Sequence, residues 1–344
     1  MSKTLTAAVA LSLVASAALA ADPLLITGAG ATFPAPLYTK WFSEYNKLKP
    51  GVQINYQSIG SGGGIKQITE KTVSFGATDA PMNEEELAKA PGVLHLPTVL
   101  GAVVVTYNEP SITSLKLSSD TLAGIFLGKI SKWNDPAIAK DNPGVKLPDT
   151  NLTNVHRSDG SGTTGVFTDY LAKVSPEFKA AVGQGKAVKW PGGLGGKGNE
   201  GVTGLVKQTP GAIGYVELAY ANQNKLPLVA LKNADGHFVT PSTETTSAAA
   251  AKAELPPDYR ISITNAPGKD AYPIAAFTYL LVYTDQTDEA KGKELISFLH
   301  WAFHEGQAFA QPLDYAPLPA AVVARLDKTL ATITVQGKKL AAGK

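Results

Sequence analysis

Short apolar runs that alternate with helix-like patterns limit the fold of this chain more than any other feature of its sequence. Leu24 to Ile26 and Val103 to Val105 are apolar runs of strand length. After the first run, Leu37, Trp41 and Tyr45 recur at the four-residue spacing of one helix face. Such alternation is typical of an α/β protein, and 344 residues are enough for about two domains.

The N-terminus has the order of a secretory signal peptide. Lys3 precedes an uncharged run from Leu5 to Ala20, which ends in Ala18-Leu19-Ala20. A membrane-spanning helix is the alternative, but these 16 residues are fewer than the roughly 20 that a span needs. We therefore expect residues 1–20 to be a signal peptide, with cleavage after Ala20 and export to the periplasm.

Net charge and cysteine content exclude several classes of function. The 31 basic and 29 acidic residues give a formal net charge of only +2, whereas a sequence-independent nucleic-acid binder needs a concentrated basic face. The chain has no cysteine, which excludes disulfides, thiolate chemistry and zinc–thiolate sites and fits a bacterial periplasm. We therefore expect no nucleic-acid partner, no cofactor and no metal in the functional site.

Three segments share one design, in which a strand end is followed by small residues with hydroxyl groups and then by a helix start. They are residues 30–33, 60–63 and 159–163, with the sequences Gly-Ala-Thr-Phe, Gly-Ser-Gly-Gly and Asp-Gly-Ser-Gly-Thr. A helix N-terminus presents unpaired N–H groups and a partial positive charge, and glycine lets the backbone approach an anion. One such loop alone is more often an ordinary helix cap. Three of them, with Arg157 beside the last, favour a site for a small oxyanion.

Motifs for other chemistries fail on their context. Residues 196–201 match G-x-G-x-x-G, but the strand before them is weak, which argues against a dinucleotide site. Neither Ser61 nor Ser161 lies in a G-x-S-x-G nucleophile motif. His300 and His304 are one helical turn apart, but no Glu follows His300, so a surface or packing pair is favoured over a metal site. We therefore expect a protein that is not an enzyme.

The glycine loops resemble those of the periplasmic phosphate-binding proteins of bacterial high-affinity phosphate ABC transporters. The matching stretches span the mature chain and are residues 27–36, 59–64, 75–81, 159–163, 190–199, 210–217 and 313–316. The resemblance implies a two-lobed α/β periplasmic-binding-protein fold, in which each lobe is a mixed sheet flanked by helices. It places lobe I at residues 21–106 and 281–344 and lobe II at residues 107–280, with hinge crossings near Tyr107 and Leu280.

The resemblance also implies which residues contact phosphate. Lobe I would supply two hydroxyls, a backbone N–H and a carboxylate, from Thr32, Ser61, Phe33 and Asp79 respectively. Lobe II would supply a guanidinium, two hydroxyls and a backbone N–H, from Arg157, Ser161, Thr163 and Gly162 respectively. Asp159 would hold the guanidinium in place. Gly62 and Thr164 stand where relatives often have Ser, beside the site rather than in it.

The function implied by the resemblance is high-affinity binding of inorganic phosphate and its delivery to the permease subunits of an ABC importer. Hinge closure would bury the ligand, and we expect the chain to act as a monomer. Two alternatives stay open. One is an exported phosphomonoesterase, which would need a nucleophile, a general acid and usually metal ions. The other is a binding protein for sulfate or another tetrahedral oxyanion.

Asp79 favours phosphate over sulfate. An ionised carboxylate accepts hydrogen bonds and cannot donate them, so it repels a fully deprotonated anion. Hydrogen phosphate and dihydrogen phosphate carry a P–OH group that can donate to Asp79, whereas sulfate has no proton to donate at neutral pH. A site built around such a bond rejects the ligand that lacks it by about 10⁴–10⁵. The alternative role for Asp79 is a turn cap, because Asp79-Ala80-Pro81 is also a plausible turn sequence.

Overall fold

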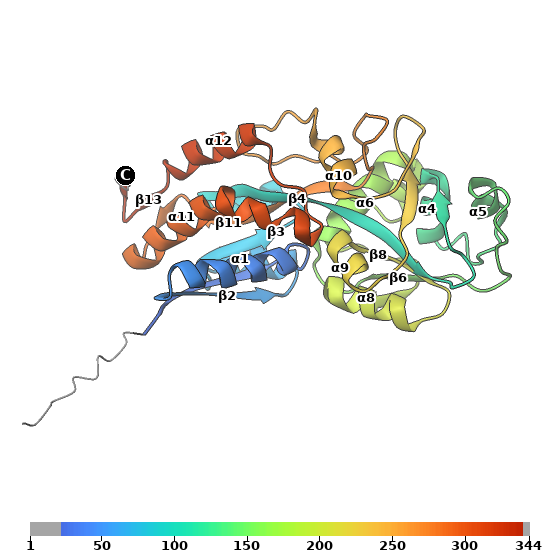
Figure 1. The fold of residues 1–344 in the computed structure, drawn as a ribbon, viewed down its shortest axis with the longest axis horizontal. Coiled ribbons are helices and arrows are strands. Elements are labelled where there is room, and N and C mark those ends of the chain that lie inside the picture. Colours follow the sequence, from blue (N-terminus) through green and yellow to red (C-terminus); the bar gives the residue numbers. More distant parts are fainter. Residues whose placement is uncertain (1–21, 340–344) are drawn as a thin grey trace, which may run out of the picture.

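An eight-stranded sheet runs through both halves of the molecule and carries the elements that form the candidate site (Figure 1). The computed structural model describes residues 22–339, so the signal peptide predicted for residues 1–20 lies outside the described residues. In spatial order, the strands of this sheet are β2 (Val52–Ser58), β1 (Leu24–Gly30), β3 (Phe75–Thr78), β11 (Ala275–Tyr283), β4 (Val93–Asn108), β8 (Ala212–Glu217), β6 (Thr153–Arg157) and β7 (Leu194–Gly196).

The pairing of these strands defines two lobes. Strand β1 is parallel to β2 and β3 in lobe I, and β6 is parallel to β7 and β8 in lobe II. Strands β4 and β11 are antiparallel to their neighbours, so the sheet is mixed. The two-lobed α/β fold implied by the resemblance is therefore confirmed.

The long strand β4 joins the two lobes. Its residues 93–102 pair with β11, and its residues 103–108 pair with β8 of lobe II. The sequence predicted a strand only at Val103 to Val105, and the observed strand extends ten residues further towards the N-terminus. The lobe boundaries expected at 106/107 and 280/281 stay a prediction, because strand pairing alone does not locate a hinge.

Helices surround the sheet in both lobes (Figure 1). Lobe I carries α1 (Ala35–Leu48), α2 (Ser61–Thr69), α3 (Glu84–Lys89), α11 (Glu289–Phe303), α12 (Ala320–Leu330) and two 3₁₀ helices, Glu305–Phe309 and Gln311–Leu313. Lobe II carries α4 (Ser119–Phe126), α5 (Pro136–Asp141), α6 (Gly162–Val174), α7 (Pro176–Ala181), α8 (Gly198–Gln208) and α9 (Leu218–Gln223), while α10 (Thr243–Ala250) packs on β4 and β11. Among residues 22–339, no helix combines the length and the apolar composition that crossing a bilayer requires.

Two small sheets complete the described part of the chain. One contains β10 (Phe238–Val239), β9 (Val229–Lys232) and β5 (Leu115–Leu117). The other contains β12 (Asp285–Gln286), β13 (Thr334–Val335) and β14 (Lys338–Lys339).

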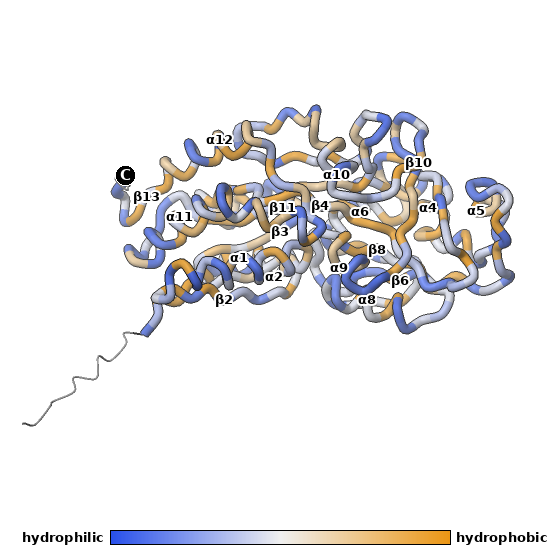
Figure 2. The backbone as a smooth tube through the Cα atoms, in the orientation of Figure 1, coloured by the Kyte–Doolittle hydropathy of each residue, from blue (hydrophilic) through white to orange (hydrophobic). Residues whose placement is uncertain are grey.

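Helix α1 shows how the apolar spacing of the sequence builds the core. The helix begins after Pro34, and Leu37, Trp41 and Tyr45 are buried, as their spacing predicts. The Trp41 indole N–H also donates to the Gly306 carbonyl at 2.7 Å. Hydrophobic residues likewise follow the central strands of the sheet in Figure 2. This packing holds the N-terminus of α1 at the end of β1.

Gly64 lets helix α2 lie directly against the sheet of lobe I. An ideal Cβ at this position would lie 2.5 Å from the Gly30 Cα and 2.7 Å from the carbonyl oxygens of Ala29 and Ala77. All three are backbone atoms, which cannot rotate out of the way. The close packing therefore fixes where α2 begins, next to the candidate site.

We expect Gly64→Ala to lower the free energy of unfolding by about 1–3 kcal/mol, because the added methyl group must displace backbone. Gly204→Ala is a matched control, since Gly204 also lies inside a helix but an added Cβ there meets no atom within 4 Å beyond the neighbouring backbone of its own helix. The control should gain about 0.5–1 kcal/mol from the better helix propensity of alanine. Urea denaturation measures both effects, and equal stability of the two variants would contradict the packing account.

Candidate functional site

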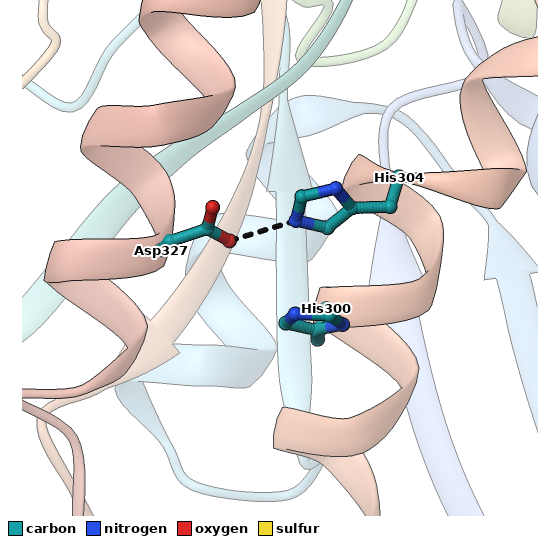
Figure 3. Close-up of side chains that lie close together, drawn as sticks. All are labelled: His300, His304 and Asp327. Atoms are coloured by element: carbon teal, nitrogen blue, oxygen red, sulfur yellow. Dashed lines mark hydrogen bonds and ion pairs between the residues drawn. The ribbon is translucent and has the colours of Figure 1, made fainter. Parts of the chain in front are cut away.

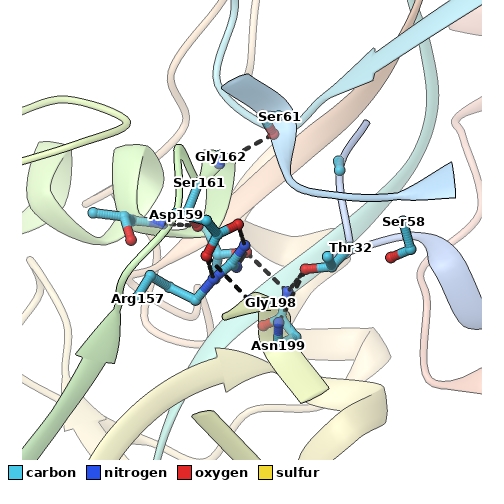
Figure 4. Close-up of polar contacts among 12 residues, drawn as sticks. Thr32, Ser58, Ser61, Arg157, Asp159, Ser161, Gly162, Gly198 and Asn199 are labelled. Atoms are coloured by element: carbon cyan, nitrogen blue, oxygen red, sulfur yellow. Dashed lines mark hydrogen bonds and ion pairs between the residues drawn. The ribbon is translucent and has the colours of Figure 1, made fainter. Parts of the chain in front are cut away.

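Three helix N-termini meet between the two lobes (Figure 4). Helix α1 follows β1, α2 follows β2 and α6 follows β6. Because the carboxyl ends of parallel strands lie at one edge of a sheet, the loops after β1 and β2 face the cleft from lobe I, and the loop after β6 faces it from lobe II. The structure thus brings together the three loops that the sequence singled out.

The loops before α2 and α6 touch across the cleft. The Gly162 N–H donates to Ser61 Oγ at 3.0 Å, and the Gly62 N–H donates to the Gly160 carbonyl at 2.8 Å. A Cβ on Gly162 would lie only 2.5 Å from Asp79 Oδ2. Only glycine at position 162 therefore permits this close approach of the two lobes.

Arg157 and Asp159 form a buried ion pair at the end of β6. The guanidinium Nε donates to Asp159 Oδ1 at 2.7 Å and Nη2 donates to Oδ2 at 2.5 Å, while Asp159 Oδ1 also accepts the Gly198 N–H at 3.1 Å. Burial alone would raise the pKa of the Asp159 carboxyl, but the hydrogen bonds and charge of Arg157 hold it below its usual range. The remaining guanidinium nitrogen, Nη1, faces Thr163 Oγ1 at 3.3 Å. This bidentate pairing orients the cation towards the centre of the cleft.

Asn199, at the start of α8, links the hydroxyl groups of the two lobes. Its Nδ2 donates to Thr32 Oγ1 at 2.7 Å and to Thr163 Oγ1 at 3.1 Å, and its backbone N–H donates to Thr32 Oγ1 at 3.1 Å. Its own Oδ1 accepts the Glu217 N–H at 2.9 Å, which sets the orientation of the amide. Asn199 was not among the predicted ligand residues, although it ends the stretch 190–199 that carries the resemblance and lies in the segment 196–201 that matches a dinucleotide motif.

The candidate serines also accept hydrogen bonds from the protein. Ser161 caps α6, and its Oγ accepts the Thr164 N–H at 3.0 Å. Ser61 Oγ accepts from the Gly162 N–H and, at 3.3 Å, from the Asp79 N–H. Each candidate hydroxyl oxygen is thus an acceptor for at least one protein N–H. This leaves the protons of Thr32, Ser161 and Thr163 available for an acceptor in the cleft, whereas the Ser61 hydroxyl points to Asp79 Oδ2 at 3.5 Å.

The Thr32–Phe33 segment is held through its carbonyl groups. The Tyr220 hydroxyl donates to the Thr32 carbonyl at 2.6 Å from lobe II, and the Tyr315 hydroxyl donates to the Phe33 carbonyl at 2.6 Å from lobe I. The Phe33 ring is fully buried and lies against Gly101. These contacts fix the backbone at the N-terminus of α1, where the resemblance places the Phe33 N–H.

Asp79 is a buried carboxyl at the end of β3, with only 2% of the residue exposed. Its Oδ1 accepts from the Thr278 hydroxyl at 2.9 Å, and its Oδ2 lies 3.5 Å from Ser61 Oγ. Burial raises the pKa of the carboxyl to about 7, against the opposing effects of the Thr278 hydrogen bond and the Arg157 charge. Among the described residues these hydroxyls, rather than the backbone of the turn that follows, are the partners of the carboxyl, so the geometry does not favour the turn-cap role.

A β-bulge between β4 and β11 places Thr278 beside Asp79. Thr278 pairs with Val99, but the next residue of β11 pairs with Pro97, so Thr98 is skipped. Proline lacks an N–H, and a bulge is the place where a central strand tolerates one. Thr278 was not predicted, although a hydroxyl in the largely apolar segment 275–283 is a signal that could have pointed to it.

This cleft between two α/β lobes, lined by helix N-termini and an oriented guanidinium, defines the class of two-lobed binding proteins. Residues 15–304 match the family model of the PBP superfamily domain. The chain is 50% identical over 306 residues to a phosphate-binding protein PstS of Xylella fastidiosa, which covers 88% of this chain and 84% of that protein. It is also 50% identical over 313 residues to a phosphate-binding protein PstS of Pasteurella multocida, with 90% of each chain covered. The chain belongs to the PstS family of phosphate-binding proteins within the PBP superfamily.

Solved structures at lower sequence identity share the fold. A high-affinity periplasmic phosphate-binding protein, PfluDING, bound with phosphate at pH 8.5, superposes with a TM-score of 0.72 at 21% identity, covering 89% of this chain and 93% of that one. A phosphate-binding protein from Stenotrophomonas maltophilia superposes with a TM-score of 0.70 at 19% identity, covering 88% and 93% respectively. At these identities the comparison establishes the two-lobed fold.

The raised pKa of Asp79 makes a prediction about stability. A carboxyl whose pKa is higher in the folded than in the unfolded state stabilises the fold most below the unfolded value of about 4, and this contribution is lost as pH rises through about 7. Without added anions, the free energy of unfolding of Asp79→Asn relative to that of the wild type should therefore increase by on the order of 2 kcal/mol from pH 5 to pH 8.

Urea denaturation of both proteins at the two pH values measures this change. Glu70→Gln is the control, because Glu70 is an exposed carboxylate and its removal should leave the pH dependence of the wild type in place. If the stability difference between Asp79→Asn and the wild type were the same at pH 5 and pH 8, Asp79 would not carry the raised pKa.

Proposed function

We propose that this chain binds inorganic phosphate with high affinity in the cleft and delivers it to the permease subunits of an ABC-type importer in the inner membrane. Its relatives at 50% identity are named phosphate-binding protein PstS. The observation that carries the proposal is the set of cleft hydroxyls, each of which already accepts a hydrogen bond from a protein N–H. The hydroxyl protons of Thr32, Ser161 and Thr163 are thus left to donate to the oxygen atoms of an anion, while the single proton of phosphate is left for Asp79.

The charge of the cleft supports an anion of phosphate size. Asp159 holds the guanidinium of Arg157 in place, so the positive charge of Arg157 has a fixed position in the cleft. The N-termini of α1, α2 and α6 add partial positive charge and N–H donors. In the present geometry the Gly162 N–H donates to Ser61 Oγ, so ligand binding would transfer this N–H from the serine to the anion.

Asp79 supports phosphate rather than sulfate as the ligand. An ionised Asp79 can accept a hydrogen bond from the P–OH of phosphate, but it repels sulfate. A protonated Asp79 can donate to sulfate, and a pKa of about 7 makes this form accessible. The proposed preference for phosphate therefore grows as pH rises above about 7, because protonating Asp79 for sulfate then costs about tenfold in affinity per pH unit.

Two substitutions test the proposed ligand contacts. Arg157→Ala should weaken phosphate binding by at least tenfold, because a hydrogen bond to a charged group is worth about 1.5–3 kcal/mol. Asp79→Asn should weaken phosphate binding less, because the amide NH₂ can donate to the anion. The same variant should lose most of the phosphate-to-sulfate preference, together with the increase of that preference above pH 7.

Competition calorimetry with phosphate and sulfate at pH 6.5 and 8.5 measures these effects. Arg325→Ala is the matched control, since Arg325 donates to the carbonyls of Leu255 and Pro256 outside the cleft and its loss should not change phosphate affinity. Unchanged affinity in Arg157→Ala would remove that residue from the site. An unchanged phosphate-to-sulfate ratio in Asp79→Asn would show that selectivity lies elsewhere.

The proposal includes the remaining features implied by the resemblance. The chain is exported to the periplasm, is cleaved after Ala20, acts as a monomer and is not an enzyme. The exported phosphomonoesterase is the competing function, and it predicts that the purified protein releases phosphate from a monoester in an Arg157-dependent way. N-terminal sequencing of the exported protein tests the cleavage, and a phosphatase assay tests the competing function.

Hinge closure is the proposed binding step. Thr32 and Arg157 come from different lobes, so both contact one anion only when the lobes are closed. Lys186 supplies a further contact between the lobes, beside a cavity of about 530 Å³ that Asp79 also lines. Its Nζ donates to Glu86 Oε2 at 2.7 Å and to the Pro81 carbonyl at 3.3 Å. The carbonyl of Lys186 also accepts a hydrogen bond from the Ser161 N–H at 2.8 Å, which connects the Lys186 contact directly to the loop 159–163 of lobe II.

We expect Lys186→Met to accelerate phosphate release and to weaken affinity about three- to tenfold, because the closed form loses a half-buried ion pair of about 1 kcal/mol. Lys129→Met is the matched control, since Lys129 pairs with Glu177 within lobe II. Stopped-flow experiments measure the phosphate release rate of these two variants, of Glu86→Gln and of the Lys186→Met/Glu86→Gln double variant. The comparison gives the coupling energy between Lys186 and Glu86. An additive double variant, or a scattering radius that is equal with and without phosphate, would contradict closure through this contact.

A further inference from the structure

Three potential metal ligands lie together on lobe I, outside the cleft. His300 lies in the last turn of α11, His304 directly follows this helix as its C-cap, and Asp327 projects towards them from α12 (Figure 3). The two imidazole rings stack with centroids 4.5 Å apart, and His304 Nε2 lies 2.9 Å from Asp327 Oδ1. One ligand atom from each of the three residues falls within 4.8 Å of the others.

We propose that His300, His304 and Asp327 form a binding site for a divalent transition-metal ion, with Zn²⁺ as the reference ion. A spacing of four residues is one that zinc proteins use, and here the stacked rings of His300 and of the C-cap His304 bring two nitrogens close together at the end of α11. Two nitrogens and one carboxylate oxygen suit zinc, copper or nickel, whereas magnesium and calcium prefer oxygen ligands alone. Three protein ligands leave a further position for water.

The geometry requires only small side-chain movements to take the ion. With bonds of about 2.0–2.2 Å, the ligand atoms of a tetrahedral zinc ion lie about 3.4 Å apart. The His304–Asp327 separation is already shorter than this, and the remaining separations are at most 4.8 Å. His304 and Asp327 have 37% and 38% of their side chains exposed, so neither is locked by core packing.

The third ligand distinguishes this cluster from the histidine pair in the sequence. His300 and His304 alone were interpreted as a surface or packing pair, because no Glu follows His300. Asp327 is 23 residues further along the chain and reaches the pair only because α12 packs on α11. A bound ion would therefore link α11 to α12 and stabilise this contact, independently of whether the cleft binds phosphate.

Calorimetric titration of Zn²⁺ into untagged, EDTA-treated full-length protein tests the site, since a polyhistidine tag would bind the same ion. We expect one ion per chain at micromolar affinity, a higher melting temperature with Zn²⁺, and visible absorption of bound Co²⁺ with the intensity of a low-coordinate site. His300→Ala and His304→Ala should each weaken Zn²⁺ binding at least tenfold. Asp327→Asn should weaken it about tenfold as well, because the amide retains a hydrogen-bonding group but not the charge.

His237→Ala is the matched control, since it removes an exposed histidine elsewhere in the chain and should leave Zn²⁺ affinity unchanged. Circular dichroism in EDTA verifies that every variant is folded. The proposal is overturned if the His300→Ala/His304→Ala double variant binds Zn²⁺ as tightly as the wild type, or if the bound Co²⁺ has the weak absorption of the hexaaquo ion. Because the readout is metal binding alone, its failure would leave the proposed phosphate function untouched.

Discussion

The contact between Gly162 and Ser61 is the constraint on which the geometry of the cleft depends. It brings the N-termini of two helices from opposite lobes together, and both ends carry partial positive charge. Such an arrangement is unfavourable unless negative charge lies nearby. Asp159 is already paired with Arg157, so the negative charge on the protein side comes from Asp79, which is buried and whose charge varies with pH. The partial positive charge of the helix N-termini is therefore not fully balanced by the protein, which favours an anion in the cleft.

The middle of the sheet positions the pH-sensitive group. Pro97 interrupts the ladder of β4, and the bulge at Thr98 restores the pairing with β11. The same irregularity places the Thr278 hydroxyl on the Asp79 carboxyl. The bulge in this central strand would by itself weaken the sheet, but here it positions the Thr278 hydroxyl that orients the Asp79 carboxyl at the edge of the cleft.

Local patterns made much of the fold and of the candidate site predictable. A strand end, glycines, hydroxyl residues and a helix start are contiguous in the sequence, so the loops around Thr32, Ser61 and Ser161 could be recognised without knowing how they meet. Asn199 and Thr278 could not be assigned in this way, because their roles exist only after distant elements pack together. The length of β4 was underestimated for a related reason, since Pro97 argues against a strand until the bulge opposite it is known.

Selectivity in the proposed site follows from the number of protons that the ligand and Asp79 share. Hydrogen phosphate and an ionised Asp79 hold one proton between them, and the hydrogen bond is the same whichever oxygen carries it. Sulfate and an ionised Asp79 hold no proton between them, so sulfate binds only after Asp79 has taken up a proton from solvent. Because burial raises the pKa of Asp79 to about 7, that proton is available near neutral pH and becomes scarce above it. Burial thus limits the rejection of sulfate near neutrality, and it also brings the proton affinity of the carboxylate closer to that of its ligand, which favours a strong shared hydrogen bond.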